Sequence, residues 1–409
     1  MIGQKVRKAV NAVRVTDIHT HLYDPAFGDL LVWGVDELLT YHYLIAEYFR
    51  YSTTSYADFR ALPKQAQADA IWKTLFVDHS PVSEACRGVL TALDLLGLPV
   101  KKRDLSFYRK WFAKQDVGKH IDRVFDLAGM RDCVMTNDPF DDLERPVWLK
   151  GYKADERFKP ALRIDPVLLG WSSAVAKLIE WGYAVTRELT PKTLDEIRRF
   201  LREWAKRTKG LYVGVSLPPT FHAPDESDTG TILEQALLPV CEELNLPLAL
   251  MIGVKRRVNP ELTMAGDAVG TARIEPVEHL CAKFPKNKFM LTMLARENQQ
   301  AACVAARKFR NLHLFGCWWF VNNPSTIREM TEQRVELLGL SFTPQHSDAR
   351  VLDQVLYKWD HSRKVIGDVL ARKYEDLAAT GWAPTDKEIA RDVEGLFGGN
   401  FRDFIMRGC

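Results

Sequence analysis

The segment Val13-Arg14-Val15-Thr16-Asp17-Ile18-His19 is a short apolar run that ends in polar residues, and it is the first of eight such runs. Most of these runs are followed by a longer stretch whose apolar residues have helical spacing. Near-continuous apolar runs are typical of parallel strands that are covered on both faces. The eight predicted strands span residues 13–19, 132–136, 161–164, 212–217, 248–252, 289–294, 312–317 and 341–344.

Helices alternate with these strands along the second half of the chain. They are predicted at residues 168–181, 193–206, 231–243, 274–284, 297–309 and 326–337. Strands that alternate with helices indicate a parallel sheet, and eight is the number that closes a (β/α)8 TIM barrel. The sequence therefore predicts an α/β fold of this type. An open doubly wound sheet has the same alternation, but no GxGxxG follows the first run, which disfavours its dinucleotide-binding form.

A long helical insertion follows the first predicted strand. Residues 23–130 contain no clear strand before the second run begins, and they carry helical patterns at 35–50, 56–62, 64–76, 81–95 and 105–115. We expect this insertion to form a lid subdomain over one end of the barrel, within a single domain of residues 1–409. Helical patterns at 351–380 and 386–404 predict a C-terminal extension of the outer ring of helices.

The composition excludes several classes of protein. The chain has 409 residues, with 56 Lys plus Arg against 53 Asp plus Glu and a formal net charge of +3. This near-balance argues against a nucleic acid or a membrane surface as the main partner. The seven cysteines form no CxxC pair, which disfavours a zinc knuckle and a disulfide framework. We expect a cytoplasmic protein without a signal peptide or a membrane span.

His19 and His21 lie at the end of the first predicted strand, and in a (β/α)8 barrel the functional residues lie at the carboxyl ends of the strands. Residues i and i+2 of an extended segment face the same side, so both imidazoles can reach one cation. Asp348 follows the eighth predicted strand, which neighbours the first in a closed barrel. The three side chains predict a divalent-metal site with open positions for water or substrate. In the alternative interpretation, Asp348 is the N-cap of a helix that begins near Val351.

Further motifs occur in order along nearly the whole chain. Beside Asp17-Ile18-His19-Thr20-His21, they are His42-Tyr43, Thr136-Asn137-Asp138-Pro139, Arg163-Ile164-Asp165-Pro166, Gly316-Cys317-Trp318-Trp319-Phe320, Ser347-Asp348-Ala349-Arg350 and, more loosely, Asn400-Phe401. Together these motifs resemble the uronate isomerases, also called glucuronate isomerases, of the amidohydrolase superfamily. The chain looks like a divergent member, because Met251 stands where the family has a His on the fifth strand, Asn137 replaces an acid, and Lys255-Arg256-Arg257 is unusually basic.

The resemblance implies an aldose–ketose isomerase. Its reaction interconverts D-glucuronate or D-galacturonate with D-fructuronate or D-tagaturonate, by proton transfer through a cis-enediol. It also implies a divalent metal, with zinc as the first candidate and manganese or another divalent ion as alternatives. His19, His21 and Asp348 would hold this metal, and they would hold it weakly, because the thioether of Met251 is a poor ligand for a hard ion.

Candidate roles follow from the chemistry of this reaction. A base must take the proton from C2, and Asp348 is the candidate, with Asp17 supporting a metal ligand. The carboxylate of the substrate needs a bidentate partner, for which Arg163 and Arg350 are suited. The alternatives are an ion pair of Arg163 with Asp165 and a surface position for Arg350.

The insertion supplies His42 and Tyr43, which we expect to act within a lid that excludes water. Tyr43 is a candidate to donate a proton or to bind a hydroxyl, and its alternative is a core aromatic. Trp318 and Trp319 are expected to form a wall of the substrate site. One of the pair is expected to face the barrel interior and the other the helices, because neighbours on a strand alternate. The remaining candidates, His313, His346 and His361, are expected to be packing or surface residues.

Two other functions remain open at this point. One is a metal-dependent hydrolase of the same superfamily that acts on a sugar-acid lactone, ester or amide, with Asp348 as the base for a metal-activated water. The other is a non-catalytic barrel that binds a sugar acid. The presence of Met251 in place of a His is the feature that supports this hypothesis. In each case the expected partner is a small sugar acid, with no nucleic acid and no membrane. A homo-oligomer is compatible with the sequence.

Overall fold

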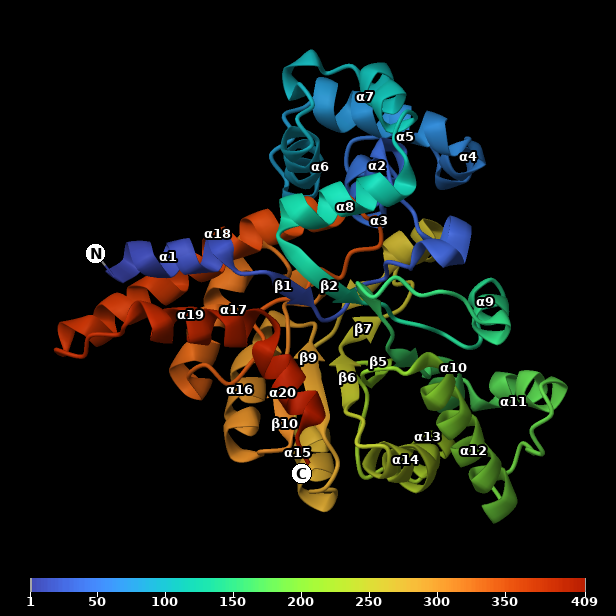
Figure 1. The fold of residues 1–409 in the computed structure, drawn as a ribbon. Helices are drawn as coiled ribbons and strands as arrows, with labels where there is room; N and C mark the ends of the chain where they lie inside the picture. Colours follow the sequence, from blue (N-terminus) through green and yellow to red (C-terminus); the bar gives the residue numbers. More distant parts are fainter. Residues whose placement is uncertain (1, 409) are drawn as a thin grey trace.

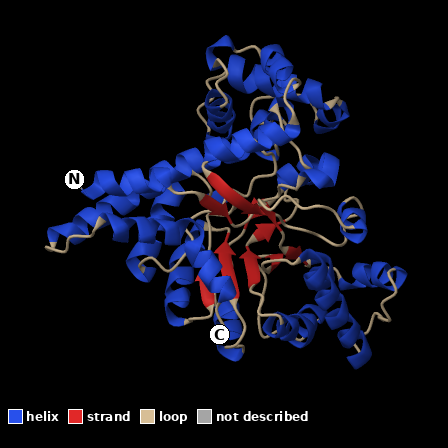
Figure 2. Ribbon diagram, in the orientation of Figure 1, coloured by secondary structure: helices blue, strands red, loops and turns tan. Residues whose placement is uncertain are grey.

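The computed structural model describes residues 2–408, in which helices surround a centre of strands (Figure 2). The strands are β1 Val15–Asp17, β2 Met130–Val134, β3 Phe158–Lys159, β4 Leu162–Arg163, β5 Val213–Leu217, β6 Leu248–Ile252, β7 Val254–Lys255, β8 Ala268–Val269, β9 Phe289–Met293 and β10 Leu312–Leu314. They form a parallel sheet of order β1-β2-β3 and a second of order β10-β9-β6-β5-β4, whereas β7 and β8 form an antiparallel pair. The fold is therefore mixed α/β with parallel sheets, as predicted, but the strand order of the described residues contains no closed ring.

Seven of the eight predicted strands contain a regular strand, and the eighth prediction is wrong. Residues 341–344 form only an isolated bridge, in which Thr343 pairs with Phe315. Two local features explain why no strand forms there. The backbone of Ser341 is still hydrogen-bonded to Leu338 of the preceding helix, and Pro344 has no N–H to donate.

Residue pairs outside the named strands link the edges of the two sheets. Asn137 bridges Leu162, which joins the end of β2 to β4. The bridge between Phe315 and Thr343 places the segment around Thr343 next to the residues that follow β10. The loop 347–349 is hydrogen-bonded in turn to residues that follow β1.

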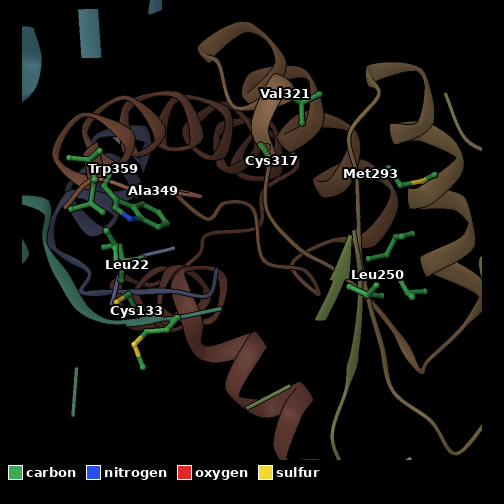
Figure 3. Packing of buried hydrophobic residues seen from close by; sticks show 14 of the residues in the cluster. Leu22, Cys133, Leu250, Met293, Cys317, Val321, Ala349 and Trp359 are labelled. Carbon is green, nitrogen blue, oxygen red and sulfur yellow. The ribbon is translucent and has the colours of Figure 1, made fainter. Parts of the chain in front are cut away.

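Side chains of the strands alternate between two apolar clusters. In β6, Leu248, Leu250 and Ile252 belong to the larger cluster, whereas Ala249 and Met251 belong to the smaller one. The larger cluster extends around both sheets, and Figure 3 shows Leu250 on one side of it and Trp359 on the other. The smaller cluster contains one or two side chains from each of several strands or the residues beside them, together with side chains of α20. Its members at these positions are Ile18, Val134, Ala161, Tyr212, Ala249, Met251, Met290, Phe315, Phe401 and Phe404.

Helices cover the outside of the strands. Those of the second half are α9 Glu144–Lys150, α10 Asp165–Leu169, α11 Trp171–Glu180, α12 Pro191–Thr208, α13 Asp228–Ile232, η4 Leu233–Leu237, α14 Leu238–Glu243, η5 Pro260–Gly266, α15 Glu275–Lys283, η6 Arg296–Asn298, α16 Gln299–Lys308, η7 Trp319–Val321, α17 Pro324–Leu338, α18 Gln354–Ala379, α19 Asp386–Glu394, η8 Gly395–Gly399 and α20 Asn400–Met406. The N-terminal helix α1 Ile2–Ala12, which the sequence did not predict, packs along α18.

The regular elements of the predicted insertion before β2 are all helices, and Val32 forms an isolated bridge with Val351. The insertion contains η1 Pro25–Leu30, α2 Val35–Leu39, α3 His42–Tyr48, α4 Tyr56–Ala61, α5 Lys64–Trp72, η2 Lys73–Val77, α6 Glu84–Leu95, η3 Val100–Lys102, α7 Leu105–Phe112 and α8 Val117–Ala128. Figure 1 shows that α4, α5, α6 and α7 gather in a lobe away from the strands, while α8 leads back into β2. The helix predicted at 35–50 is broken into α2 and α3, and α3 packs against η5. His42 is consequently the first residue of a helix.

Two further findings concern the cysteines and the helices of the described residues. Six cysteines lie within residues 2–408, and all six are free and buried, while Cys409 lies outside the described residues. Across the same residues, no helix combines the length and the apolar character needed to cross a membrane.

Candidate functional site

His19, His21 and Asp348 converge where β1 ends. Oδ1 of Asp348 lies 3.5 Å from Nε2 of His19 and 3.4 Å from Nε2 of His21. One ligand atom from each of the three residues falls within 4.8 Å of the others. The backbone holds this arrangement, because the His21 N–H donates to the carbonyl of Ala349 (2.7 Å) and the Asp348 N–H to that of His19 (3.2 Å).

Hydroxyl groups fix the tautomers of the two imidazoles. The Tyr212 hydroxyl donates to the Ile18 carbonyl (3.0 Å), so at its 3.1 Å contact with His19 it must accept from Nδ1–H. The Thr136 hydroxyl donates to the Thr20 carbonyl (3.1 Å) and must likewise accept from Nδ1–H of His21 (2.9 Å). Each histidine is thereby left with a lone pair on Nε2, the atom that faces Asp348.

These three residues fit a divalent metal ion. Nε2 of His19 and Oδ1 of Asp348 are buried without a hydrogen-bond partner among the described residues. An unsatisfied buried polar atom costs about 1–3 kcal/mol, a cost that an ion bound between the two atoms would remove. Two neutral imidazoles and one carboxylate are a common donor set for such ions. Met251, in contrast, belongs to the smaller apolar cluster and does not border the cleft.

The charge state of His21 suits the same purpose. Burial, reinforced by the nearby Arg350, lowers its pKa to about 3. At neutral pH, therefore, His21 is neutral, which is the state in which it binds a cation.

Asp17 ties the loop of Asp348 to the rest of the fold. Its Oδ1 accepts the Ser347 N–H (3.0 Å) and its Oδ2 accepts Nε1–H of Trp359 in α18 (2.9 Å). Burial raises its pKa to about 6, against the opposing effect of these hydrogen bonds. The alternative interpretation of Asp348 as a helix N-cap is wrong, because α18 begins at Gln354 and Asp353 occupies the cap position.

The three residues open on a narrow cleft. Eight of the nine predicted site residues border it: His19, His21, His42, Arg163, Trp318, Trp319, Asp348 and Arg350. Its volume is about 30 Å³, the scale of a single water molecule. Ser216 and Arg256 also border the cleft, and neither was predicted from the sequence as a site residue. Ser216 lies near the carboxyl end of β5, a position that the barrel rule would have flagged.

The two predicted arginines differ in their partners. Arg163 forms a bidentate ion pair with Asp165, at 2.9 and 2.6 Å, and also donates to Ser216 (3.0 Å), so the predicted alternative of an ion pair is present. Arg350 borders the cleft, with Nη2 3.5 Å from Nε2 of His21. Among the described residues it pairs with no carboxylate.

Of the four predicted aromatic site residues outside the candidate metal site, three border the cleft and one does not. His42 borders the cleft, and its ring lies 5.5 Å from that of Trp319. Tyr43 does not border the cleft but a neighbouring cavity of about 290 Å³. The expectation that Trp318 and Trp319 face opposite sides is wrong, because both border the cleft. The alternation of a strand does not reach them, since β10 ends at Leu314 and Trp319 has a φ of 46° at the start of η7.

The three other histidines considered in the sequence, His313, His346 and His361, are packed inside the fold. His346 is fully buried, with its ring centroid 5.1 Å from that of His19. His361 is ion-paired with Glu84, and His313 contacts the Thr343 hydroxyl at 3.0 Å. A buried lysine, Lys358, was not singled out in the sequence, because it lies within a continuous helical pattern.

No protein-family model matches the chain, and no curated protein matches it. The crystal structure of a uronate isomerase from Bacillus halodurans matches with a TM-score of 0.98 and 53% sequence identity, over 99% of this chain and 96% of that chain. A uronate isomerase from Thermotoga maritima matches with a TM-score of 0.79 at 15% identity, over 98% and 97% of the two chains. A glucuronate isomerase from Caulobacter crescentus matches with a TM-score of 0.70 at 14% identity, over 99% and 93%. The last two matches show a shared fold alone.

Proposed function

This chain belongs to the uronate isomerase family, and we propose that its cleft interconverts an aldose-type hexuronate with the corresponding ketose. The substrate would be D-glucuronate or D-galacturonate, and the product D-fructuronate or D-tagaturonate. The observation that carries this proposal is the convergence of His19, His21 and Asp348 beside an arginine that has no carboxylate partner.

The reaction requires one proton to leave C2 of the open-chain sugar and one to arrive at C1, through a cis-enediol. We propose that Asp348 takes the first proton and returns it, because its carboxylate borders the cleft. The narrow cleft keeps bulk water away from the enediol while the proton is in transfer.

His19, His21 and Asp348 are also the residues that would hold the divalent ion, for which zinc is the first candidate and manganese an alternative. When bound, such an ion supplies positive charge next to the oxygens on which negative charge develops in the enediol. Tyr212 and Thr136 support the site by presenting the Nε2 lone pairs. With Met251 in the place of a His, the part of the chain that the structure describes offers three ligands here, which suits an exchangeable ion.

Arg350 is the proposed partner of the substrate carboxylate, because its planar guanidinium suits a bidentate contact and pairs with no carboxylate among the described residues. Arg163 reaches the same cleft with part of its guanidinium held by Asp165, so we assign it a hydroxyl or one carboxylate oxygen. Trp318 and Trp319 form the wall against which the carbon chain lies.

We propose that residues 23–130 act as a lid on this site. A hexuronate does not fit a cleft of about 30 Å³, so a wall must move when it enters. His42, at the start of α3, separates the cleft from two larger cavities of about 290 and 380 Å³. Movement of α3 would admit the sugar and bring His42 back over it, with Tyr43 behind His42 rather than at the reacting carbons.

We further propose that the whole chain is one domain and that its two sheets are arcs of a (β/α)8 barrel. The bridges from Asn137 to Leu162 and from Phe315 to Thr343, and the hydrogen bond from His21 to Ala349, support this arrangement. A smaller apolar cluster with members from successive strand regions is what a barrel interior contains.

The competing reaction is hydrolysis of a sugar-acid lactone, ester or amide. Incubation of the purified protein with hexuronates and with their lactones, with and without Zn²⁺ or Mn²⁺, separates the two when mass spectrometry detects added water and NMR detects the ketose. Isomerisation leaves the mass of the sugar acid unchanged and yields a ketose, whereas hydrolysis adds one water. A mass increase with lactones, together with no ketose from any uronate, would replace the isomerase proposal with the hydrolase.

A further inference from the structure

Lys358 is a buried ammonium group without an anionic partner. The residue is 4% exposed, and within residues 2–408 its Nζ forms no hydrogen bond and no ion pair. Its nearest ring contacts are with Tyr357, at 5.2 Å from the centroid, and Tyr43, at 5.7 Å. Burial penalises this charge and lowers the pKa of Lys358 to about 8, although the carboxylates of Asp348, Glu84 and Asp17 oppose the shift from a distance. A buried cation of this kind is stabilised when an anion binds to it.

Lys358 borders the cavity of about 290 Å³ that lies between α3, α6, η7 and α18. His42 and Trp319 border both this cavity and the metal cleft, so they form the partition between the two. Nε2 of His42 and Nε1 of Trp319 are both buried without a hydrogen-bond partner in the described part of the chain. Three residues with an unpaired polar group therefore border this cavity.

The carboxylates that border this cavity are already engaged. Each has a partner of its own: Glu84 has His361, Asp267 has Arg256, and Glu47 accepts from Ser83. Of the charged side chains that border the cavity among the described residues, only Lys358 is left for a ligand. The cavity is close to the lower limit of about 300 Å³ that is usual for small-molecule pockets.

We propose that this cavity is a second binding pocket, distinct from the metal cleft, for a small hydroxylated carboxylate. The ammonium of Lys358 binds the carboxylate by charge-assisted hydrogen bonds. The indole N–H of Trp319 donates to a hydroxyl oxygen of the ligand, and His42 Nε2 supplies another polar contact. The ligand is either the sugar acid of the reaction or another small carboxylate, since both present the same chemistry. The pocket does not depend on the reaction assigned to the cleft.

The test uses D-gluconate, which carries a carboxylate and hydroxyls but no aldehyde to isomerise. Its binding is followed through the indole N–H signal of Trp319 in the NMR spectrum of the full-length protein, assigned by its loss in Trp319→Phe. Lys358→Met is compared with Lys364→Met, a change in the same helix at an exposed lysine that is paired with Asp360. We expect gluconate to shift the signal in the wild type and in Lys364→Met, and its affinity to fall about tenfold or more in Lys358→Met.

Thermal unfolding of the same variants separates a binding role from a structural one. We expect Lys358→Met to melt no lower than the wild type, because methionine of similar size replaces an unpaired buried charge. Acetate is the second ligand: a shift as large as that of gluconate supports a pocket for any small carboxylate, and a smaller one supports a pocket for sugar acids.

Three outcomes would overturn the proposal: no shift of the Trp319 signal in the wild type, unchanged gluconate affinity in Lys358→Met, or a large loss of melting temperature in that variant. Conversion of uronates by the wild type is measured separately, so failure of the second pocket and failure of the isomerase remain distinguishable.

Discussion

At the scale of single residues, two hydroxyl groups determine the tautomers of the histidines in the candidate metal site. Tyr212 and Thr136 each donate their only hydroxyl proton to a carbonyl, so each accepts from a histidine Nδ1–H. The lone pairs of His19 and His21 consequently point at Asp348. This second layer of contacts sets ligand basicity and orientation, although neither hydroxyl would touch the ion.

Replacement of Thr136 by valine keeps the side-chain shape and removes the hydroxyl. We expect the affinity for Zn²⁺ to fall about 10–100-fold, because His21 loses the contact that fixes its tautomer. Competition with a chromogenic chelator measures this affinity. Thr331→Val is the matched control, since that hydroxyl is also buried and donates to a backbone carbonyl, within α17 and away from the cleft. Equal zinc affinities of the two variants would disprove the orienting role.

At the scale of an element, the turn after β10 determines how residues pack beside the candidate metal site. Gly316 has a φ of +66°, and a Cβ at this position would lie 1.7 Å from Nδ1 of His346. The ring of His346 packs in turn against that of His19. The same turn ends the strand before Trp318 and Trp319, which lets both border the cleft.

Gly316→Ala should therefore destabilise the protein more than Gly339→Ala. Gly339 has a similar φ of +63°, but a Cβ there meets nothing within 4 Å. Both changes force an L-residue into the left-handed region, at a cost of about 1–2 kcal/mol. Only Gly316→Ala adds a clash with His346, for which overpacking costs about 1–3 kcal/mol more. Urea denaturation of both variants gives the comparison, and equal midpoints would show that His346 moves aside freely.

At the scale of the whole molecule, the buried histidines couple folding to pH. His313 of β10 stacks on Phe404 of α20 and contacts Thr343, so it joins three separate segments. Burial lowers its pKa to about 3, whereas in the unfolded chain it is near 6.5. Its contribution to stability is thus complete above pH 6.5 and is lost as the pH falls from there toward 3.

His313→Gln removes this titration while keeping a nitrogen near Thr343. Between pH 7.5 and pH 5, we expect the wild type to lose on the order of 1–2 kcal/mol more unfolding free energy than the variant. Other groups titrate equally in both proteins and cancel in this difference, which chemical denaturation at the two pH values measures. Parallel pH dependence of the two proteins would contradict a neutral, buried His313.

Much of this molecule could be predicted from its sequence, and the failures have physical causes. Apolar runs located seven strands, and the rule that functional residues follow barrel strands was enough to bring His19, His21 and Asp348 together. Periodicity could not identify Lys358, because a lysine within a helical pattern looks the same whether it faces solvent or a cavity. Nor could it find the break at residues 40–41, which decides that His42 borders the cleft and Tyr43 does not.

The central claim is that Asp348 moves the proton that converts an aldose-type uronate into a ketose. Its most direct test is NMR detection of ketose from D-glucuronate and D-galacturonate, with Zn²⁺ or Mn²⁺ present, for the wild type and Asp348→Asn. We predict that the wild type forms ketose from at least one uronate and that the variant, folded equally well by circular dichroism, is slower by a factor of about 10²–10⁴. Ketose formation at an undiminished rate by Asp348→Asn, or none by the wild type with either ion, would contradict it.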